Sequence, residues 1–418
     1  MLGLSAALTV PRVASKPLKV MPAGVFAEER VKFYDVGHVS GVVNAPVYSP
    51  GAGRYDMGSL AQVSLSVPAL AGQIWVYVTL NKADEENGIG WRVRGMAPPY
   101  DPLASRVRSG QQVFKLPANI GSTLVNVVVG TGFAGSLQAV QVVAIETVLA
   151  QPFDFYVCLG QSQMAATTNA LGLAAELDHC SDPTLLYFPG ATYAGHGTVI
   201  GQVEALRAPL QANAESLGGG TVTAGMRSNG VSPAIAFAKR IRQSTAAGRN
   251  VVIVQAAVSS TSLVGTAAAW NPVGSNPFAY NHAVSVIAGA MAASPVGSKI
   301  RGVLWAQGES DLAALAAYPA AWAAMRAAFE ATWSANNWVT APVPWLIGTT
   351  PPDAVHPSVP AFIDMQSQMD ALSGHGYAQP RCRVVNRLPG IEPDGVHATA
   401  QSNRWLGHAM AERFLAAQ

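Results

Sequence analysis

The chain has 418 residues, of which half are hydrophobic and 12% are charged, and its formal net charge at pH 7 is +2. This length predicts two or three globular domains with sizeable cores. The near-neutral charge, without a run of like charges, argues against a nucleic-acid partner, and no uninterrupted apolar stretch is long enough for a membrane span.

Residues 1–25 are predicted to form an extended N-terminal arm. Their apolar stretch has no basic residue before it and is interrupted at Pro11, so no clear signal peptide is recognised. The location therefore stays open between virion-associated, extracellular and cytoplasmic. Three cysteines, Cys158, Cys180 and Cys382, lack metal-ligand spacing and are expected to be buried thiols, and we expect neither a metal nor a cofactor.

Residues 26–150 show short stretches in which apolar and polar residues alternate. Gly, Pro and Asn clusters separate these stretches at intervals near ten residues, which is typical of an antiparallel β-sandwich or jelly roll. We expect this unit to bind or anchor rather than to catalyse. The predicted strands are Gln62 to Val67, Gln73 to Leu80, Trp91 to Gly95, Gln112 to Leu116, Thr123 to Val129 and Ser136 to Ile145.

Residues 151–418 alternate short apolar runs with longer segments of helical period, which indicates an α/β domain with a parallel sheet. The predicted strands are Phe153 to Leu159, Val251 to Ala257, Arg301 to Trp305, Pro344 to Thr349 and Cys382 to Asn386. The predicted helices are Pro233 to Ala246, Tyr280 to Ala293, Pro319 to Ala335 and Ala400 to Ala417. Segment 178–229, rich in Gly, Ser and Thr, is expected to be a long loop that serves a binding site.

Polar segments follow the predicted strands at 160–163, 259–262 and 307–311. Ligands of open parallel sheets bind beyond the carboxyl ends of the strands, so these segments are expected to converge. Asp394 and His397 precede the last helix at a spacing that lets the carboxylate hold the imidazole ring. Such a ring can take the proton of a serine, and Ser162 stands at the end of the first strand of this region.

Three segments together resemble a known superfamily. Gly160-Gln161-Ser162-Gln163, the run Trp-Ala-Gln-Gly-Glu-Ser-Asp at 305–311, and Asp-Gly-Val-His at 394–397 are similar to motif blocks of the SGNH/GDSL hydrolases. More narrowly, they resemble the carbohydrate-esterase branch that includes sialate O-acetylesterases and acetylxylan esterases. The resemblance covers about 151–418 and implies a flavodoxin-like three-layer α/β/α fold.

The resemblance also implies roles for residues. Ser162 would be the nucleophile, His397 the general base and then acid, and Asp394 its orienting partner. The oxyanion hole would combine the backbone N–H groups of Ser162 and Ser260 with the side-chain amide of Gln307. The residues expected to contact the substrate are Gln161, Gln163, Trp270 and Glu309.

Two positions depart from that branch. Ser259-Ser260 replaces a glycine pair, which predicts a demanding backbone angle in this turn. Gln163 replaces an asparagine after the nucleophile. Both departures are expected to alter substrate preference.

The sequence therefore predicts a serine esterase that removes O-acetyl or other short acyl groups from a carbohydrate through an acyl-enzyme. One alternative is a glycan-binding or structural component of a larger assembly, such as a phage tail or spike, anchored through residues 1–150. A lipase-like or thioester-cleaving enzyme of the same superfamily is another. Glu309 and Asp311 could also form the carboxylate pair of a glycosidase, although Glu309 suits equally well the bracing of the Gln307 loop.

Overall fold

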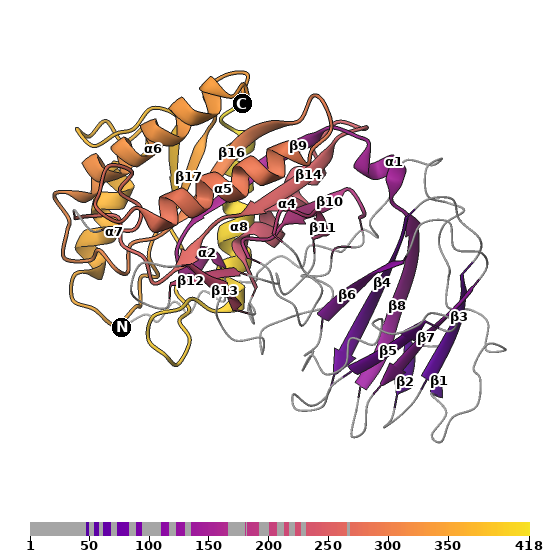
Figure 1. Cartoon of the computed structure of the whole chain (residues 1–418). Coiled ribbons are helices and arrows are strands. Elements are labelled where there is room, and N and C mark those ends of the chain that lie inside the picture. The colour runs from indigo at the N-terminus through magenta and orange to yellow at the C-terminus, as the bar shows by residue number, and fades with distance from the viewer. Residues whose placement is uncertain are drawn as a thin grey trace, which may run out of the picture.

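The structure is a computed structural model of the whole chain (Figure 1). It describes separate strands between residues 47 and 129 and, further on, residues 135–165, 180, 182–191, 200–206, 213–216, 222–226, 231–265 and 268–418. Nearly all described side chains lie beyond residue 142. The arm predicted for residues 1–25 lies outside the described residues.

Among the described residues before 145, eight strands pair in two antiparallel sheets. The strands are β1(Val47–Ser49), β2(Arg54–Met57), β3(Gln62–Val67), β4(Ile74–Lys82), β5(Ile89–Val93), β6(Gly110–Leu116), β7(Thr123–Val129) and β8(Gly135–Ala144). One sheet has the order β1-β2-β8-β4-β6 and the other β3-β7-β5. The six strands expected in this region correspond to β3 to β8, whereas the short β1 and β2 were not predicted.

A short helix, α1(Glu146–Leu149), joins these strands to the rest of the chain. Ile145 and Val148 are fully buried, and they pack in one cluster with Trp75 and Phe153. The side-chain amide of buried Asn250 donates to the backbone oxygen of Val148 at 2.6 Å. The end of the region before residue 150 is therefore packed into the core of the α/β region.

The main sheet has seven strands in the order β11-β10-β14-β9-β16-β17-β18. The strands are β9(Phe153–Gly160), β10(Leu185–Phe188), β11(Glu204–Ala205), β14(Asn250–Gln255), β16(Lys299–Ala306), β17(Trp345–Gly348) and β18(Cys382–Val385). All neighbours from β10 to β18 are parallel, and β11 pairs antiparallel at the edge. The predicted parallel sheet and its five predicted strands are confirmed.

The expectation of a structureless loop at 178–229 is wrong in part. This segment contains β10 and β11, as well as β12(Asn213–Ser216) and β13(Val222–Met226), which form a small sheet with β15(Val258–Ser259). All four apolar residues of β10 are buried. The strand pairs with β14 on one side and with β11 on the other. Such a short strand carries too little pattern to stand out within a Gly-rich segment.

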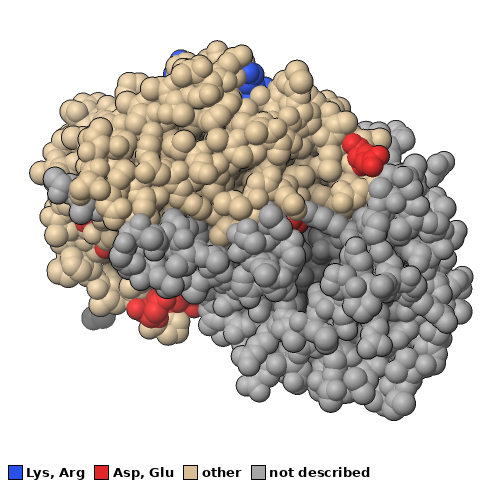
Figure 2. All heavy atoms as spheres, viewed as in Figure 1, with Lys and Arg blue, Asp and Glu red and all other residues tan. Residues whose placement is uncertain are grey.

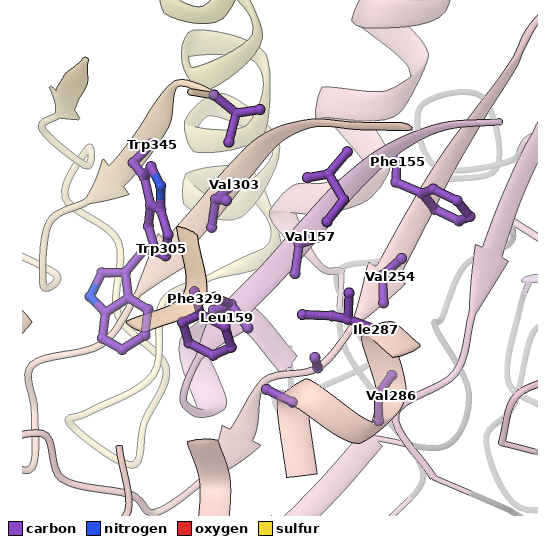
Figure 3. Packing of buried hydrophobic residues seen from close by; sticks show 14 of the residues in the cluster. Phe155, Val157, Leu159, Val254, Val286, Ile287, Val303, Trp305, Phe329 and Trp345 are labelled. Atoms are coloured by element: carbon purple, nitrogen blue, oxygen red, sulfur yellow. The ribbon is translucent and has the colours of Figure 1, made fainter. Parts of the chain in front are cut away.

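Helices cover both faces of the main sheet (Figure 1). The helices α5(Phe278–Ala292), α6(Tyr318–Ala335) and α7(Val359–Gln368) pack on one face, and α4(Pro233–Arg242) and α8(Ala400–Leu415) pack on the other. Strand β9 serves both sides, because Phe155, Val157 and Leu159 join the first cluster and Tyr156 and Cys158 the second. Figure 3 shows side chains of β9, β14 and β16 gathered against those of α5 and α6.

The local predictions for the helices are mostly confirmed. The four predicted helices are present, and the apolar side chains expected on one face of α6 are all buried; they are Trp322, Met325, Phe329 and Trp333. Thr399 caps α8 by accepting a hydrogen bond from the backbone of Ser402. All three cysteines are buried, as expected, and none of them forms a disulfide. Helix α7 was not predicted.

The order of the strands locates a crevice. Strand β9 lies between β14 and β16, so the chain builds the sheet first on one side of β9 and then on the other. The strand order reverses at β9, so the loops that follow β9 and its neighbour run to opposite faces of the sheet. They leave a space between them at the carboxyl ends of the strands, which is where ligands of parallel sheets bind. The site is therefore expected just after β9 and β16.

On the face that Figure 2 shows, charged side chains form small separate groups in an otherwise uncharged surface. None of the helices described here is both long and apolar enough to cross a membrane.

Candidate active site

The end of β9 is shaped by Gly160. Its φ is +119°, and a Cβ atom there would lie 2.2 Å from the backbone oxygen of Ala306 on β16. The next residue, Gln161, donates its backbone N–H to that same oxygen at 2.9 Å. This close approach of two strands requires glycine, and it turns the chain so that Ser162 begins the short helix α2(Ser162–Ala165) at the carboxyl edge.

The predicted nucleophile, base and acid lie in contact. His397 Nε2 is 2.9 Å from Ser162 Oγ, although the two residues are 235 positions apart, and His397 Nδ1 is 2.7 Å from Asp394 Oδ2. With Nδ1–H donating to the carboxylate, Nε2 is left to accept from the serine hydroxyl. The arrangement can therefore move a proton from Ser162 to His397.

Asp394 is held in its ionised form. Burial opposes the charge, but hydrogen bonds to the carboxylate from the His397 backbone, the His397 ring and the Val396 backbone outweigh it, so the pKa of Asp394 lies below its ordinary value. Both backbone N–H groups reach Oδ1 at 2.9 Å. A carboxylate that stays charged fixes the tautomer of His397 and stabilises its protonated ring.

The turn after β15 borders the same crevice. Ser260 is exposed and has a φ of +57°, which bears out the demanding backbone angle expected where relatives carry glycine. Asp311 anchors the continuation of this turn, because its carboxylate accepts from the backbone N–H groups of Leu263 at 2.8 Å and Val264 at 3.1 Å.

Gln307 does not offer its amide to the crevice. Its Nε2 donates to the backbone oxygen of Thr261 at 3.1 Å and to Asp311 Oδ2 at 2.5 Å, and its Oε1 accepts from the Tyr318 hydroxyl at 2.9 Å. Only 1% of the residue is exposed. The expectation that Gln307 donates to the oxyanion is corrected, because both of its amide hydrogens are already used.

Trp270 does not line the site either. The residue is fully buried, and its ring packs edge-on against Trp305 with the ring centroids 5.3 Å apart. Its Nε1 donates to Thr261 Oγ1 at 2.8 Å. Trp270 therefore supports the turn after β15 from beneath and cannot contact a carbohydrate, contrary to the expectation.

Two further residues expected to bind substrate are buried next to Ser162. Gln163 is 2% exposed, and its amide is bonded to the backbone of Val396 and Ala398, which excludes the expected contact with substrate. Gln161 is 3% exposed, and its Oε1 has no hydrogen-bond partner among the described residues. A role for Gln161 toward the substrate stays a prediction.

Glu309 is the remaining residue that was expected to contact the substrate. Burial raises the pKa of its carboxyl group, and the positive charge of the Arg387 guanidinium opposes that shift. Arg387 is 4% exposed, and its guanidinium donates to the backbone oxygen of Thr349 at 3.1 Å. Burial lowers the pKa of Arg387 to about 10, and the charge of Glu309 opposes this.

The structure does not favour a glycosidase pair. Both oxygens of Asp311 accept backbone hydrogen bonds, so this carboxylate is committed to holding the turn. Sequence reasoning missed the bracing roles of Asp311, Tyr318 and Arg387. Asp311 stands within a recognised motif, which was a usable signal, whereas nothing in the sequence singles out Tyr318 or Arg387. Among the residues that the structure describes, no group of three or more His, Cys, Asp or Glu is arranged to hold a metal ion.

Comparisons with known proteins add to this geometry. Residues 152–416 match the family described as "Carbohydrate esterase, sialic acid-specific acetylesterase". A search among curated proteins gives no match.

Similar solved structures include a protein from Arabidopsis thaliana, with 17% identity, a TM-score of 0.46, and coverage of 63% of this chain and 98% of that one. NanS shares 15% identity at a TM-score of 0.48, covering 64% of this chain and 98% of its own. A carbohydrate acetylesterase from Xanthomonas citri shares 16% identity at a TM-score of 0.37, covering 85% and 74%.

Proposed function

Because this chain belongs to the carbohydrate esterase family of sialic acid-specific acetylesterases, we propose that Ser162, His397 and Asp394 are the catalytic triad of its O-acetylesterase reaction. The enzyme is a carboxylic ester hydrolase that removes acetyl groups from a carbohydrate. The observation that carries the assignment is the pair of contacts at 2.9 and 2.7 Å that aligns serine, imidazole and carboxylate.

The chemistry rests on those contacts. His397 Nε2 removes the hydroxyl proton as Ser162 Oγ attacks the acetyl carbonyl, and Asp394 stabilises the imidazolium that forms. The protonated ring then gives its proton to the leaving sugar oxygen, which leaves an acetyl-serine. Water attacks this ester with His397 again as the base, and acetate is released.

Hydrogen-bond donors must stabilise the negative charge that develops on the carbonyl oxygen during the attack. We propose that the backbone N–H group of Ser162, at the start of α2, and that of Ser260, in the turn after β15, are these donors. The left-handed backbone of Ser260 supports this role, because strained positions of this kind gather at functional sites. Losing one oxyanion donor typically costs about 2.7 to 4 kcal/mol of barrier.

We further propose that residues 151–418 form an SGNH-type, flavodoxin-like domain. Taken in chain order, the five strands expected from the sequence have the spatial order 2-1-3-4-5, which supports this class. For residues 26–150 we propose a β-sandwich that anchors the enzyme to a larger assembly. The two antiparallel sheets are compatible with such a unit. A purely glycan-binding protein is not favoured, since the three residues needed for hydrolysis are present and in contact.

Replacing Ser162 by alanine tests the assignment. Turnover of a chromogenic acetyl ester, and acetate release from O-acetylated polysaccharides, should fall by a factor of about 1,000 or more, with the thermal unfolding midpoint unchanged. A fluorophosphonate should label the wild-type chain at Ser162. Retained turnover in the alanine variant, or labelling at another serine, would refute the triad.

A further inference from the structure

The side chain of Gln163 links the nucleophile to the turn that carries the base. Its Nε2 donates to the backbone oxygen of Val396 at 2.8 Å, and its Oε1 accepts from the backbone N–H of Ala398 at 3.3 Å. Val396 and Ala398 are the two neighbours of His397. One carboxamide is thus bonded to both peptide units that flank the general base.

The turn at 391–398 is otherwise stabilised largely from within. Ile391 and Ala398 form an isolated antiparallel bridge, and the backbone N–H of Glu392 donates to the backbone oxygen of His397 at 2.7 Å. Asp394 binds groups of the same turn. These bonds fix the shape of the turn, but they do not fix its distance from Ser162.

Within the described part of the chain, two residues from elsewhere bond to the backbone of this turn. The backbone N–H of Val355 donates to the oxygen of Gly395 at 3.0 Å, and Gln163 supplies the other contact. Gln163 is the one that directly follows the nucleophile in the sequence. Its position is therefore set by the same strand end that sets Ser162.

Gln163 and Asp394 differ in how far their side chains are exposed to solvent. The side chain of Asp394 is 49% exposed, and that of His397 is 24% exposed, so water competes for their contact. Gln163 is 2% exposed, so its two hydrogen bonds are shielded and breaking them would leave buried polar groups unpaired. The buried amide is thus the stiffer link between the two sides of the site.

We propose that Gln163 is a positioning residue that sets the distance between Ser162 Oγ and His397 Nε2. It touches no substrate and acts through the backbone on either side of His397. An asparagine at this position is one methylene shorter and would not reach both peptide units at this separation. The inference rests on the proposed roles of Ser162 and His397.

The test uses the full chain with Gln163→Met, which keeps the length without the hydrogen bonds, and Gln163→Asn, which keeps an amide. Two rates are measured, namely kcat for a chromogenic acetyl ester and the labelling of Ser162 by a fluorophosphonate. In the methionine variant both should fall by about 10- to 100-fold, because small misplacements of reacting groups are costly. KM should stay within about twofold. The asparagine variant should lie between this variant and the wild type.

Asn250→Leu is the matched control. Asn250 is also a buried amide bonded to two backbone oxygens, those of Val148 and Gln151, but it lies at the opposite edge of the sheet. Its loss should lower the unfolding midpoint to a degree similar to that of Gln163→Met while kcat remains that of the wild type.

Wild-type kcat and labelling rate in a folded Gln163→Met variant would overturn the proposal, as would an equal loss of kcat in Asn250→Leu. Should the methionine variant fail to fold, the asparagine variant decides, and a wild-type labelling rate there also overturns it. Failure of the wild-type chain to be labelled at Ser162 would instead refute the triad on which the proposal rests.

Discussion

At the scale of single residues, the proposed site is supported by buried groups. Asp311 and Trp270 hold the turn after β15 from below, and the Gln163 amide holds the turn of the base. Each of them is buried beneath the residues that are proposed to react. Hydrogen bonds from the interior of the domain thus hold the turns on which the proposed site is built.

Replacing Asp394 by asparagine should lower kcat by about 100-fold or more, since the protonated ring loses its counter-charge and the tautomer of His397 is no longer fixed. KM should change little. Steady-state kinetics on the acetyl ester would check this, and an unchanged kcat would contradict it.

The same variant predicts a pH effect on stability. The pKa of Asp394 is lowered in the fold, so its carboxylate stabilises the protein above the ordinary value of 3.8, and this contribution is lost as the pH falls through the lower folded value. The difference in unfolding free energy between wild type and variant should therefore shrink as the pH falls below 3.8. Denaturant titrations at pH 3.8 and below measure it, and a difference that grows over this range would contradict the sign.

Some residues of the site could be proposed from the sequence, whereas the burial of others could not be foreseen. Ser162, Asp394 and His397 could be recognised because their spacing and neighbours form motifs tied to chemistry. Gln307 stands in a recognised segment too, and Trp270 was expected to contact the substrate, yet both side chains are buried in the core. Direction depends on packing between distant segments, so sequence alone could not have shown it.

At the scale of secondary structure, the close approach of β9 and β16 determines where the serine stands. Long apolar strands such as β9 were predictable because they are buried on both faces, and α6 because its apolar stripe is long. Helix α7 is as long as the predicted α4, but it follows a run rich in Pro. Strand β10 is as long as the predicted β17 and β18, but it lies in a segment rich in Gly, Ser and Thr. For these short elements, the surrounding sequence decided what could be predicted more than their length did.

Gly160→Ala tests this close approach. The new Cβ would lie 2.2 Å from the Ala306 oxygen at a φ of +119°, so the variant should lose about 3 kcal/mol or more of stability and most of its activity. Gly248→Ala is the control, because it also has a positive φ, of +77°, but nothing lies within 4 Å of its new Cβ. It should cost only about 1 kcal/mol. Equal losses in chemical denaturation would show that crowding against β16 is unimportant.

At the scale of the whole molecule, the boundary near residue 150 is not a free linker. Ile145 and Val148 belong to the same buried cluster as Phe153, and Asn250 depends on the backbone of α1. The boundary predicted from the change of sequence rhythm thus lies between residues that belong to one buried cluster. The change in the pattern of apolar residues marks where the β-strand region gives way to the α/β region. It does not show which preceding residues pack into the core of the α/β region.

Two fragments should therefore differ. A chain of residues 151–418 loses Ile145, Val148 and the nearer of the two acceptors of Asn250, and it should be less stable than residues 145–418 by about 3 kcal/mol or more. Denaturant unfolding of both fragments would check this, with ester hydrolysis below the unfolding transition expected in each. Equal stability would mean that α1 contributes nothing to the hydrolase core.

The turn at 391–398 has a consequence for how the enzyme fails. It carries the proposed base and its carboxylate, yet it lies near the surface and is joined to the interior by a few hydrogen bonds, while the sheet beneath it is covered on both faces. Local opening costs less than global unfolding where contacts with the interior are few. On warming, the enzyme should therefore lose its catalytic activity while its strands and helices are still intact. On cooling, the activity should return without refolding of the whole domain.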